Sequence, residues 1–243
     1  MQHDNKMSKP FKFKQFTVKQ DRCAMKIGTD GVLLGAWTSL KNNPFSVLDI
    51  GAGTGILSLM MAQRSYAEQI EAIEIDDDAY EQCAENFENS PWNDRLFCYH
   101  ASLLEFVEEV EDAFDLIICN PPFYSEDYKT DNKSRNLARF NDAMPFKHII
   151  YAVAHLLAEE GIFSIILPKK EESDFIELAS SIGLHALRIL HVKGNPYADV
   201  KRSLIEFSYM KNEVEISELI IETDRHNYTE DYINLTKDFY LKM

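Results

Sequence analysis

Short apolar runs alternate with longer amphipathic stretches along most of the chain. Such runs predict buried strands, and apolar residues repeating every three or four positions predict helices packed on a core. The predicted strands are residues 45–50, 69–75, 96–100, 114–119, 161–167, 184–192 and 203–210. The predicted helices are residues 56–63, 77–89, 103–110, 146–158 and 173–181. This alternation indicates an α/β fold with a doubly wound, mainly parallel sheet of seven strands.

The two ends of the chain depart from this alternation. The strands at 184–192 and 203–210 have no helix between them, so we expect an antiparallel pair at one edge of the sheet. Residues 211–243 are interpreted as an edge strand followed by a terminal helix. Residues 1–40 precede the first sheet strand and are interpreted as a short N-terminal extension with its own hairpin and helix. The sequence therefore divides into this extension, 1–40, and one main domain, 41–243.

Charge complicates any prediction of a nucleic-acid partner. The 243-residue chain has a net charge of −15 and a pI of about 4.9. This net negative charge by itself argues against binding of nucleic acid, because contacts to phosphate need a basic surface. The charge is unevenly spread, however. Residues 1–30 hold seven basic against three acidic side chains, and further basic stretches lie at 129–139 and 193–202. RNA binding is expected if these stretches share one face.

Other classes of protein are disfavoured by what the sequence lacks. It has no uninterrupted apolar run of about 18 residues, so we expect no membrane span. The first residues are polar and lack the apolar stretch of a signal peptide. The four cysteines and seven histidines show no zinc-binding spacing, so we expect no metal. Widely spaced cysteines are typical of reduced thiols, which favours a cytoplasmic location.

The first candidate site is the glycine-rich stretch that follows the first sheet strand and opens a helix. Its glycines are Gly51, Gly53 and Gly55. They let the backbone approach a ligand closely, and ligands of open α/β sheets bind at the carboxyl ends of strands. Asp49, just before them, would repel a pyrophosphate but suits the cationic ammonium or sulfonium of S-adenosyl-L-methionine. Glu74 ends the next strand, where an acid can accept hydrogen bonds from ribose hydroxyls.

The second candidate site follows the buried strand 114–119 and reads Asn120-Pro121-Pro122-Phe123. Two prolines end a strand and stiffen the turn. The Asn120 side-chain carbonyl and the Pro121 backbone carbonyl could then accept both hydrogens of an exocyclic amino group. Held in this way, the nitrogen becomes tetrahedral and its lone pair can attack a methyl group. Pro122 stiffens the same turn, Phe123 would stack on the substrate ring, and Asn120 would also contact the cofactor.

These stretches are similar to the motifs of a known group of enzymes. Residues 49–55, Glu74 and residues 120–123 resemble the class I Rossmann-like methyltransferases that act on amino nitrogens. A narrower resemblance, to the bacterial tRNA1(Val) adenine-N6 methyltransferases, runs nearly end to end. It is carried by residues 11–16, 25–37, 138–139 and 238–241.

The narrower resemblance implies a cofactor, a substrate and further site residues. The cofactor is S-adenosyl-L-methionine, the partner is tRNA, and the target is adenine 37 beside the anticodon. Residues 1–40 would act as a lid over substrate and cofactor, with Thr29 and Asp30 near the methionine end of the cofactor. Ser102 stands where such enzymes often carry an Asp for the cofactor's adenine. The oligomeric state stays open, with a monomer favoured.

The two motifs by themselves leave the methyl acceptor undecided. A glutamine amide of a protein and the N2 amino group of guanine in ribosomal RNA present similar nitrogens. Glutamine methylation would suit the acidic surface, but residues 1–40 are too short and too basic for the separate helical domain of release-factor enzymes. A non-catalytic RNA-binding scaffold is a further alternative, which an intact asparagine turn and glycine loop disfavour.

Overall fold

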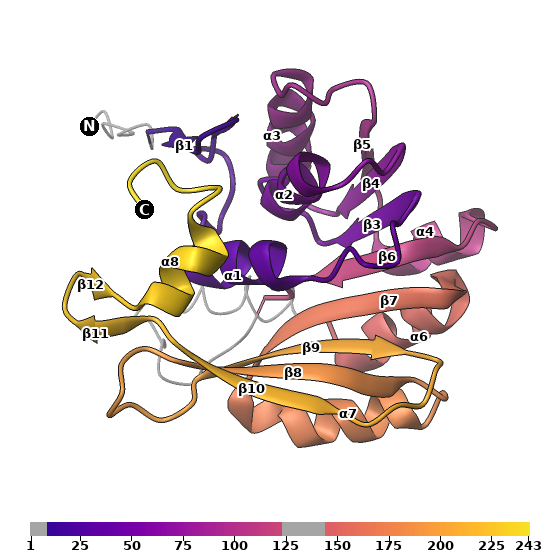
Figure 1. Cartoon of the computed structure of the whole chain (residues 1–243). Helices are drawn as coiled ribbons and strands as arrows, with labels where there is room; N and C mark the ends of the chain where they lie inside the picture. Colours follow the sequence, from indigo (N-terminus) through magenta and orange to yellow (C-terminus); the bar gives the residue numbers. More distant parts are fainter. Residues whose placement is uncertain (1–8, 123–143) are drawn as a thin grey trace, which may run out of the picture.

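The structure is a computed structural model that describes residues 9–122 and 144–243. Within these residues the main sheet has eight strands in the order β10-β8-β9-β7-β6-β3-β4-β5. The strands are β3 (Ser46–Ile50), β4 (Gln69–Glu74), β5 (Leu96–His100), β6 (Phe114–Cys119), β7 (Leu157–Pro168), β8 (His185–Lys193), β9 (Arg202–Ser208) and β10 (Glu215–Ile220). The predicted α/β architecture is confirmed, and the sheet crosses the whole molecule (Figure 1).

Strand direction follows the sequence prediction with one addition. Strands β5, β4, β3, β6 and β7 are parallel, and β9 runs antiparallel between β7 and β8. Among the described residues the main sheet has eight strands rather than the seven counted from the main runs, because β10 pairs parallel with β8. This strand is the edge strand expected within residues 211–243. Its side chains are mostly exposed, so its apolar signal is weak.

Helices cover both faces of the sheet. One face carries α1 (Thr29–Trp37), α2 (Ile56–Arg64) and α3 (Asp77–Glu88), and the other carries α4 (Leu103–Glu109), α6 (Phe146–Leu156) and α7 (Glu172–Ser180), with a short 3-10 turn at Lys169–Glu171. Each face has its own cluster of buried apolar residues, and the central strands contribute to both clusters. The central strand β6 is buried on both sides for this reason, as its dense apolar run predicts.

Local sequence explains where several helices begin. Asp76 caps α3 because its carboxylate accepts the Ala79 backbone N–H at 2.8 Å. Ser102 caps α4 in a reciprocal capping box with Glu105. One boundary was predicted wrongly: the helix expected to reach residue 158 ends at Leu156, and β7 starts at once. The pairing of β6 with β7 shifts register between Phe114 and Leu116, which accommodates the early start of β7.

The N-terminal extension folds against the C-terminal end of the chain. It holds the expected hairpin, β1 (Phe11–Lys12) with β2 (Thr17–Val18), and the expected helix α1. Its backbone bonds the C-terminal segment, because Lys14 N–H donates to the Phe239 carbonyl at 2.8 Å. The C-terminal segment forms the hairpin β11 (Glu222–Asp224) and β12 (Asn227–Tyr228), which the sequence analysis missed, and the helix α8 (Glu230–Thr236).

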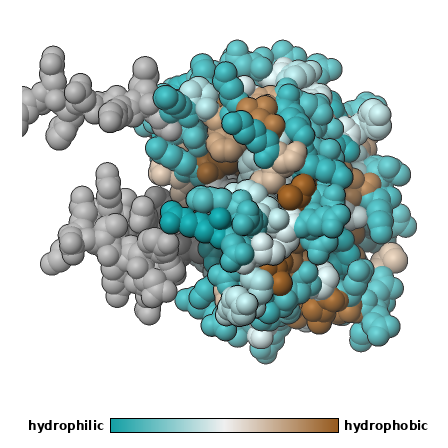
Figure 2. All heavy atoms as spheres, turned by 60° about the vertical axis from the view of Figure 1, so that its left-hand side comes forward, coloured by the Kyte–Doolittle hydropathy of each residue, from teal (hydrophilic) through white to brown (hydrophobic). Residues whose placement is uncertain are grey.

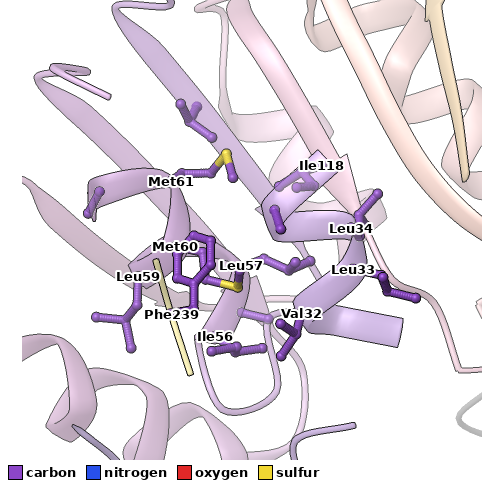
Figure 3. Packing of buried hydrophobic residues seen from close by; sticks show 14 of the residues in the cluster. Val32, Leu33, Leu34, Ile56, Leu57, Leu59, Met60, Met61, Ile118 and Phe239 are labelled. Atoms are coloured by element: carbon purple, nitrogen blue, oxygen red, sulfur yellow. The ribbon is translucent and has the colours of Figure 1, made fainter. Parts of the chain in front are cut away.

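The extension is therefore part of the main core. Figure 3 shows Val32 of α1 beside Ile56 of α2, and Phe239 from the C-terminal segment beside Met60 of α2. All of these side chains are buried. Gly35 allows the two helices to approach closely, because a Cβ there would lie 2.6 Å from the Met60 sulfur. The packing of α1 on α2 fixes the N-terminus of α1 near the carboxyl edge of the sheet (Figure 1).

None of the helices in the described part of the chain combines the length and the apolar character that crossing a membrane requires.

Candidate active site

The glycine-rich loop lies at the point where the strand order reverses. Strand β3 is flanked by β4 on one side and β6 on the other, which is the usual ligand position in open α/β sheets. The loop turns back over β4, because the N–H groups of Gly51 and Ala52 both donate to the Ile73 carbonyl at 3.0 Å. Gly51, Gly53 and Gly55 have φ angles of 71°, 55° and 78°. Glycine adopts this left-handed region at no steric cost, so the sequence spacing encodes the turn.

Glu74 is fixed beside this loop by backbone amides. One carboxylate oxygen accepts the Gly53 N–H at 2.7 Å, and the other accepts the N–H groups of Ile75 and Asp76 at 2.9 and 3.0 Å. The side chain is only 9% exposed, so these bonds compensate its desolvation. The carboxylate is thus held in one orientation at the strand end, as ribose binding requires.

A cavity of about 330 Å³ opens in front of these groups. Of the residues predicted from the sequence, Gly51, Gly53, Glu74, Ser102 and Pro122 line it. Its other walls are mainly apolar and come from the ends of β4 and β5 and the start of α4. A volume of this size falls within the range of small-molecule sites. The structure thereby brings together residues that lie far apart in the sequence.

Gly55 belongs to the turn but lies outside the cavity lining. It is buried, and a Cβ at this position would lie 2.5 Å from the Phe87 ring and 2.8 Å from the Cys83 sulfur. Its place in the structure is therefore a close contact between the loop and α3. Gly53 differs, because a Cβ there would meet nothing within 4 Å.

Asp49 also lies behind the cavity wall rather than in it. It is fully buried, and one carboxylate oxygen accepts the N–H and O–H of Ser58 at 3.1 and 2.8 Å. The other oxygen has no hydrogen-bond partner among the described residues. Burial raises the pKa of Asp49 from 3.8 to about 7, against the lowering effect of the Ser58 hydrogen bonds. An unpartnered buried oxygen at the base of the glycine loop would be compensated by a nearby cation.

Ser102 lines the cavity while it caps α4. Its hydroxyl oxygen accepts the Glu105 N–H at 3.3 Å, and the Glu105 carboxylate accepts the Ser102 N–H at 3.0 Å. These two bonds leave the hydroxyl hydrogen and a second lone pair for a ligand. A contact with the cofactor's adenine thus remains compatible with the capping role.

The asparagine turn follows directly from strand pairing. Ile50 of β3 is the register partner of Cys119 of β6, so Gly51 and Asn120 are the next residues on adjacent strands. Neighbouring strands lie about 4.8 Å apart, which places the turn next to the glycine loop. Pro121 is buried and Asn120 partly buried. Phe123, proposed to stack on the substrate ring, lies outside the described residues, as do the basic residues 129–139.

Thr29 and Asp30 start helix α1 and do not line the main cavity. Asp30 instead accepts a hydrogen bond from the Arg202 Nε at 2.8 Å in an ion pair. The helix still reaches the asparagine turn, because a Cβ at Gly31 would lie 3.7 Å from the Asn120 amide nitrogen. The N-terminus of α1 is therefore adjacent to the asparagine turn and does not line the main cavity.

Sequence reasoning missed several residues at the cavity. The extension contributes Cys23 and Met25, and the segment that leads into α6 contributes Met144, Pro145 and His148. Burial, together with the negative charge of Glu74, raises the pKa of Cys23 to about 12, so its thiol is protonated. No spacing or motif links these positions to the glycine loop, because only the tertiary fold brings them there.

Asn86 of α3 connects the N-terminal extension to the glycine-rich loop by hydrogen bonds. Its side-chain oxygen accepts the Lys19 N–H at 2.8 Å, and its amide donates to the carbonyls of Lys19 and Thr54, both at 2.9 Å. Within the described residues all three of these bonds are to backbone groups. Its effect is to hold the N-terminal extension in place at the edge of the main cavity.

The basic stretches are partly neutralised by acidic neighbours. Lys19 and Arg22 pair with Glu85 of α3, and Lys193 pairs with Glu218 at 2.8 Å. The basic stretch at residues 193–202 lies where β8 ends and β9 begins, at the same carboxyl edge of the sheet as the asparagine turn. In the described part of the chain, Lys12 and Lys201 have no ion-pair partner. The face toward this edge is largely hydrophilic, with separate apolar areas (Figure 2).

The residues at the main cavity fit S-adenosyl-L-methionine. The glycine turn leaves space for close approach, Glu74 offers a fixed carboxylate for the ribose, and the unpartnered oxygen of Asp49 offers negative charge beneath the loop. The apolar walls suit a planar base. Among the described residues, no group of three or more His, Cys, Asp or Glu side chains is arranged to hold a metal ion.

The sheet order, the glycine loop at β3 and the asparagine turn at β6 together define a Rossmann-like methyltransferase. In agreement with this, the family described as methyltransferase small domain matches residues 31–187. A predicted O-methyltransferase from Agrobacterium tumefaciens shares the fold, with a TM-score of 0.68, 20% identity, and coverage of 86% of this chain and 96% of that chain. The chain itself belongs to the family of tRNA1(Val) (adenine(37)-N6)-methyltransferases.

Three relatives carry that assignment. The protein of that name from Flavobacterium johnsoniae is 62% identical over 96% of this chain and 100% of its own length. The protein from Christiangramia forsetii is 57% identical over 97% of this chain and 99% of its own. The protein from Phocaeicola vulgatus is 45% identical over 96% of this chain and 98% of its own. The resemblance drawn from the sequence is thereby confirmed.

Proposed function

We propose that the chain transfers a methyl group from S-adenosyl-L-methionine to N6 of adenine 37 in tRNA1(Val). The observation that carries the chemistry is the pairing of Ile50 with Cys119, which puts Asn120 beside the glycine loop. The observation that carries the substrate is full-length similarity to relatives named for this reaction. We also propose a cytoplasmic location. We propose that the active form is a monomer.

The proposed residues at the main cavity hold and orient the cofactor. S-adenosyl-L-methionine supplies a methyl group on positively charged sulfur. The Glu74 carboxylate would accept hydrogen bonds from the ribose hydroxyls, and Ser102 would contact the adenine. Asp49 would stabilise the cationic end through the loop. Gly51 and Gly53 would let the backbone approach without a side chain in between.

The asparagine turn would act on the substrate amino group. The Asn120 side-chain carbonyl and the Pro121 backbone carbonyl would each accept a hydrogen bond from one of its N–H groups and so fix the position of the nitrogen. Its lone pair, otherwise delocalised into the adenine ring, would then be available to the methyl carbon, so that a nitrogen–carbon bond forms as the carbon–sulfur bond breaks and the sulfur leaves as a neutral thioether. The same two acceptors stabilise positive charge that develops on the nitrogen. One proton must leave that nitrogen, and its high acidity in the cationic product makes a dedicated base unnecessary. Phe123 is proposed to stack on the ring.

A labelled-methyl assay tests this function. The protein is incubated with labelled S-adenosyl-L-methionine and either unmodified tRNA or a release factor. Label should appear in tRNA as N6-methyladenosine. Label in protein only, or as N2-methylguanosine in ribosomal RNA, would contradict the proposal.

The role of Asn120 is tested separately. Asn120→Ala should lose most of the rate, by about 100-fold or more, because positioning and electrostatic stabilisation both depend on it. Cofactor affinity should largely survive, since the cavity walls stay intact. Asn93→Ala, which changes an exposed asparagine, is the matched control and should keep full activity. Full activity in Asn120→Ala would refute the role given to this residue.

A further inference from the structure

A second cavity of about 520 Å³ lies between the N-terminal extension and the C-terminal segment. Its walls are aromatic and basic, and the residues that matter here are Phe11, Lys12, Tyr228, Tyr232, Tyr240 and Lys242. They come from β1, β12, α8 and the residues after α8, which the fold brings together next to the start of α1 (Figure 1). This cavity is separate from the cofactor cavity and shares no lining residue with it.

The aromatic wall is rigid on one side and accessible on the other. Tyr232 is buried, with 3% of its surface exposed, and its ring lies 5.2 Å from that of Tyr228 at 33°. Tyr240 is held by the rings of Phe11 and Phe13, at 6.2 and 6.0 Å. Tyr228 is 39% exposed, so it is supported from behind and still open to a ligand. A supported, half-exposed ring is suited to stacking on a flat partner.

The charges at this cavity favour an anion. Lys12 and Lys242 line it and are exposed, and neither has an ion-pair partner among the described residues. Of the nearby acids, Asp30 at the start of α1 is paired with Arg202, whereas Glu222 lies opposite Tyr228 in the β11–β12 hairpin. Two lysines beside a pair of tyrosine rings form a local basic feature in a chain of net charge −15. Aromatic faces with nearby cations match the chemistry of a single-stranded nucleotide.

The start of helix α1 links the second cavity to the asparagine turn. Gly28 and Thr29 line it, and they lead into α1. Two residues further on, Gly31 faces the Asn120 amide nitrogen, at 3.7 Å from an added Cβ. A helix rises about 1.5 Å per residue, so the cavity and the turn sit at one helix end. This shared helix end is the route by which a nucleotide next to one held at Asn120 would reach the tyrosines.

We propose that this second cavity binds a nucleotide that neighbours the target adenine in the substrate RNA. Its base stacks on Tyr228, and its phosphate lies between Lys12 and Lys242. The inference rests on the proposed function, because it assumes that RNA is the substrate. It adds a second contact point, which would help to hold an anticodon loop while the target base occupies the asparagine turn.

Substitutions at Tyr228 test the stacking. Tyr228→Ala should raise the KM for an anticodon stem-loop about 10-fold or more, with kcat and the affinity for S-adenosyl-L-methionine little changed. Tyr228→Phe keeps the ring and should behave like the wild type. The control is Tyr66→Ala, which removes a fully exposed tyrosine between α2 and β4, at the opposite edge of the sheet. Lys12→Ala should weaken RNA binding and reduce its salt dependence, and Lys41→Ala, at the far end of α1, should not.

Abasic stem-loops identify the stacked base. Each loop nucleotide other than the target is replaced in turn by an abasic one, and binding is measured by fluorescence anisotropy without cofactor. One position should show a penalty in the wild type that disappears in Tyr228→Ala. If no position depends on Tyr228, or if Tyr228→Ala matches Tyr66→Ala, the second site is wrong although tRNA methylation still stands. If the wild type neither binds nor methylates tRNA, the proposed function itself fails.

Discussion

The buried carboxylate of Asp49 makes the stability of the cofactor-free protein depend on pH in a direction opposite to that of most acids. Burial raises its pKa from 3.8 to about 7, so the folded state favours the protonated form. A group of this kind contributes its stabilisation fully below its unfolded pKa. That contribution is lost as pH rises toward the folded pKa, because unfolding releases a proton. Asp49→Asn should remove this dependence and still accept the Ser58 hydrogen bonds.

The expected magnitude follows from the two pKa values. Each pKa unit corresponds to about 1.36 kcal/mol, so the full difference between low and high pH is on the order of 4 kcal/mol. Most of it falls between about pH 4 and pH 7. Over the practical window from about pH 5.5 to pH 8 the wild type should lose about 2 kcal/mol relative to the variant. With a typical urea dependence, that is a shift of about 1 M in the unfolding midpoint.

Urea unfolding at several pH values, without cofactor, measures this difference. The free energy of unfolding of the wild type minus that of Asp49→Asn should fall steadily as pH rises. Asp94→Asn, which changes an exposed aspartate, serves as the control for general charge effects. A wild-type minus variant difference that is constant from about pH 5.5 to pH 8 would refute the reasoning, since it would mean that Asp49 is ionised in the fold.

Three further predictions concern the same site. Binding of S-adenosyl-L-methionine should strengthen as pH rises from about 6 to 8, because binding releases a proton from Asp49. Calorimetry in two buffers of different ionisation enthalpy measures this proton release. The same proton release in Asp49→Asn would contradict the prediction. Ser102→Asp should keep the cap of α4 and tighten cofactor binding. Ser102→Ala should lower the free energy of unfolding by about 1 kcal/mol, because the cap is lost. Weaker cofactor binding in Ser102→Asp would exclude a contact between residue 102 and the adenine. Gly55→Ala should destabilise the fold by about 3 kcal/mol or more, because its Cβ meets Phe87 and Cys83. Gly53→Ala should cost only about 1 kcal/mol, from its positive φ, and should mainly lower cofactor affinity. Thermal unfolding and cofactor titration separate these last two, and equal effects of the two alanines on stability would argue against the distinction.

The sequence alone predicted most elements of the sheet and the chemistry at two strand ends. A dense apolar run of six residues such as 114–119 is typical of a strand buried on both faces, and the glycines after β3 encode a left-handed turn that few other residues adopt. These are local properties, set by side-chain period and backbone sterics. The weakly apolar β10 and the hairpin β11–β12 were harder to predict, because their residues are exposed and their pattern is not fixed by a core.

Only the tertiary structure decided how these pieces meet. Strand register puts Gly51 beside Asn120, and packing of α1 on α2 puts Gly31 against the same asparagine. The tertiary structure also gives the glycines of the predicted loop different surroundings, because Gly53 lines the cavity and Gly55 packs against α3. The second cavity joins Lys12 to Tyr228, which are separated by most of the chain. Contacts of this kind depend on long-range burial, and a sequence pattern records the period of each element but not its neighbour.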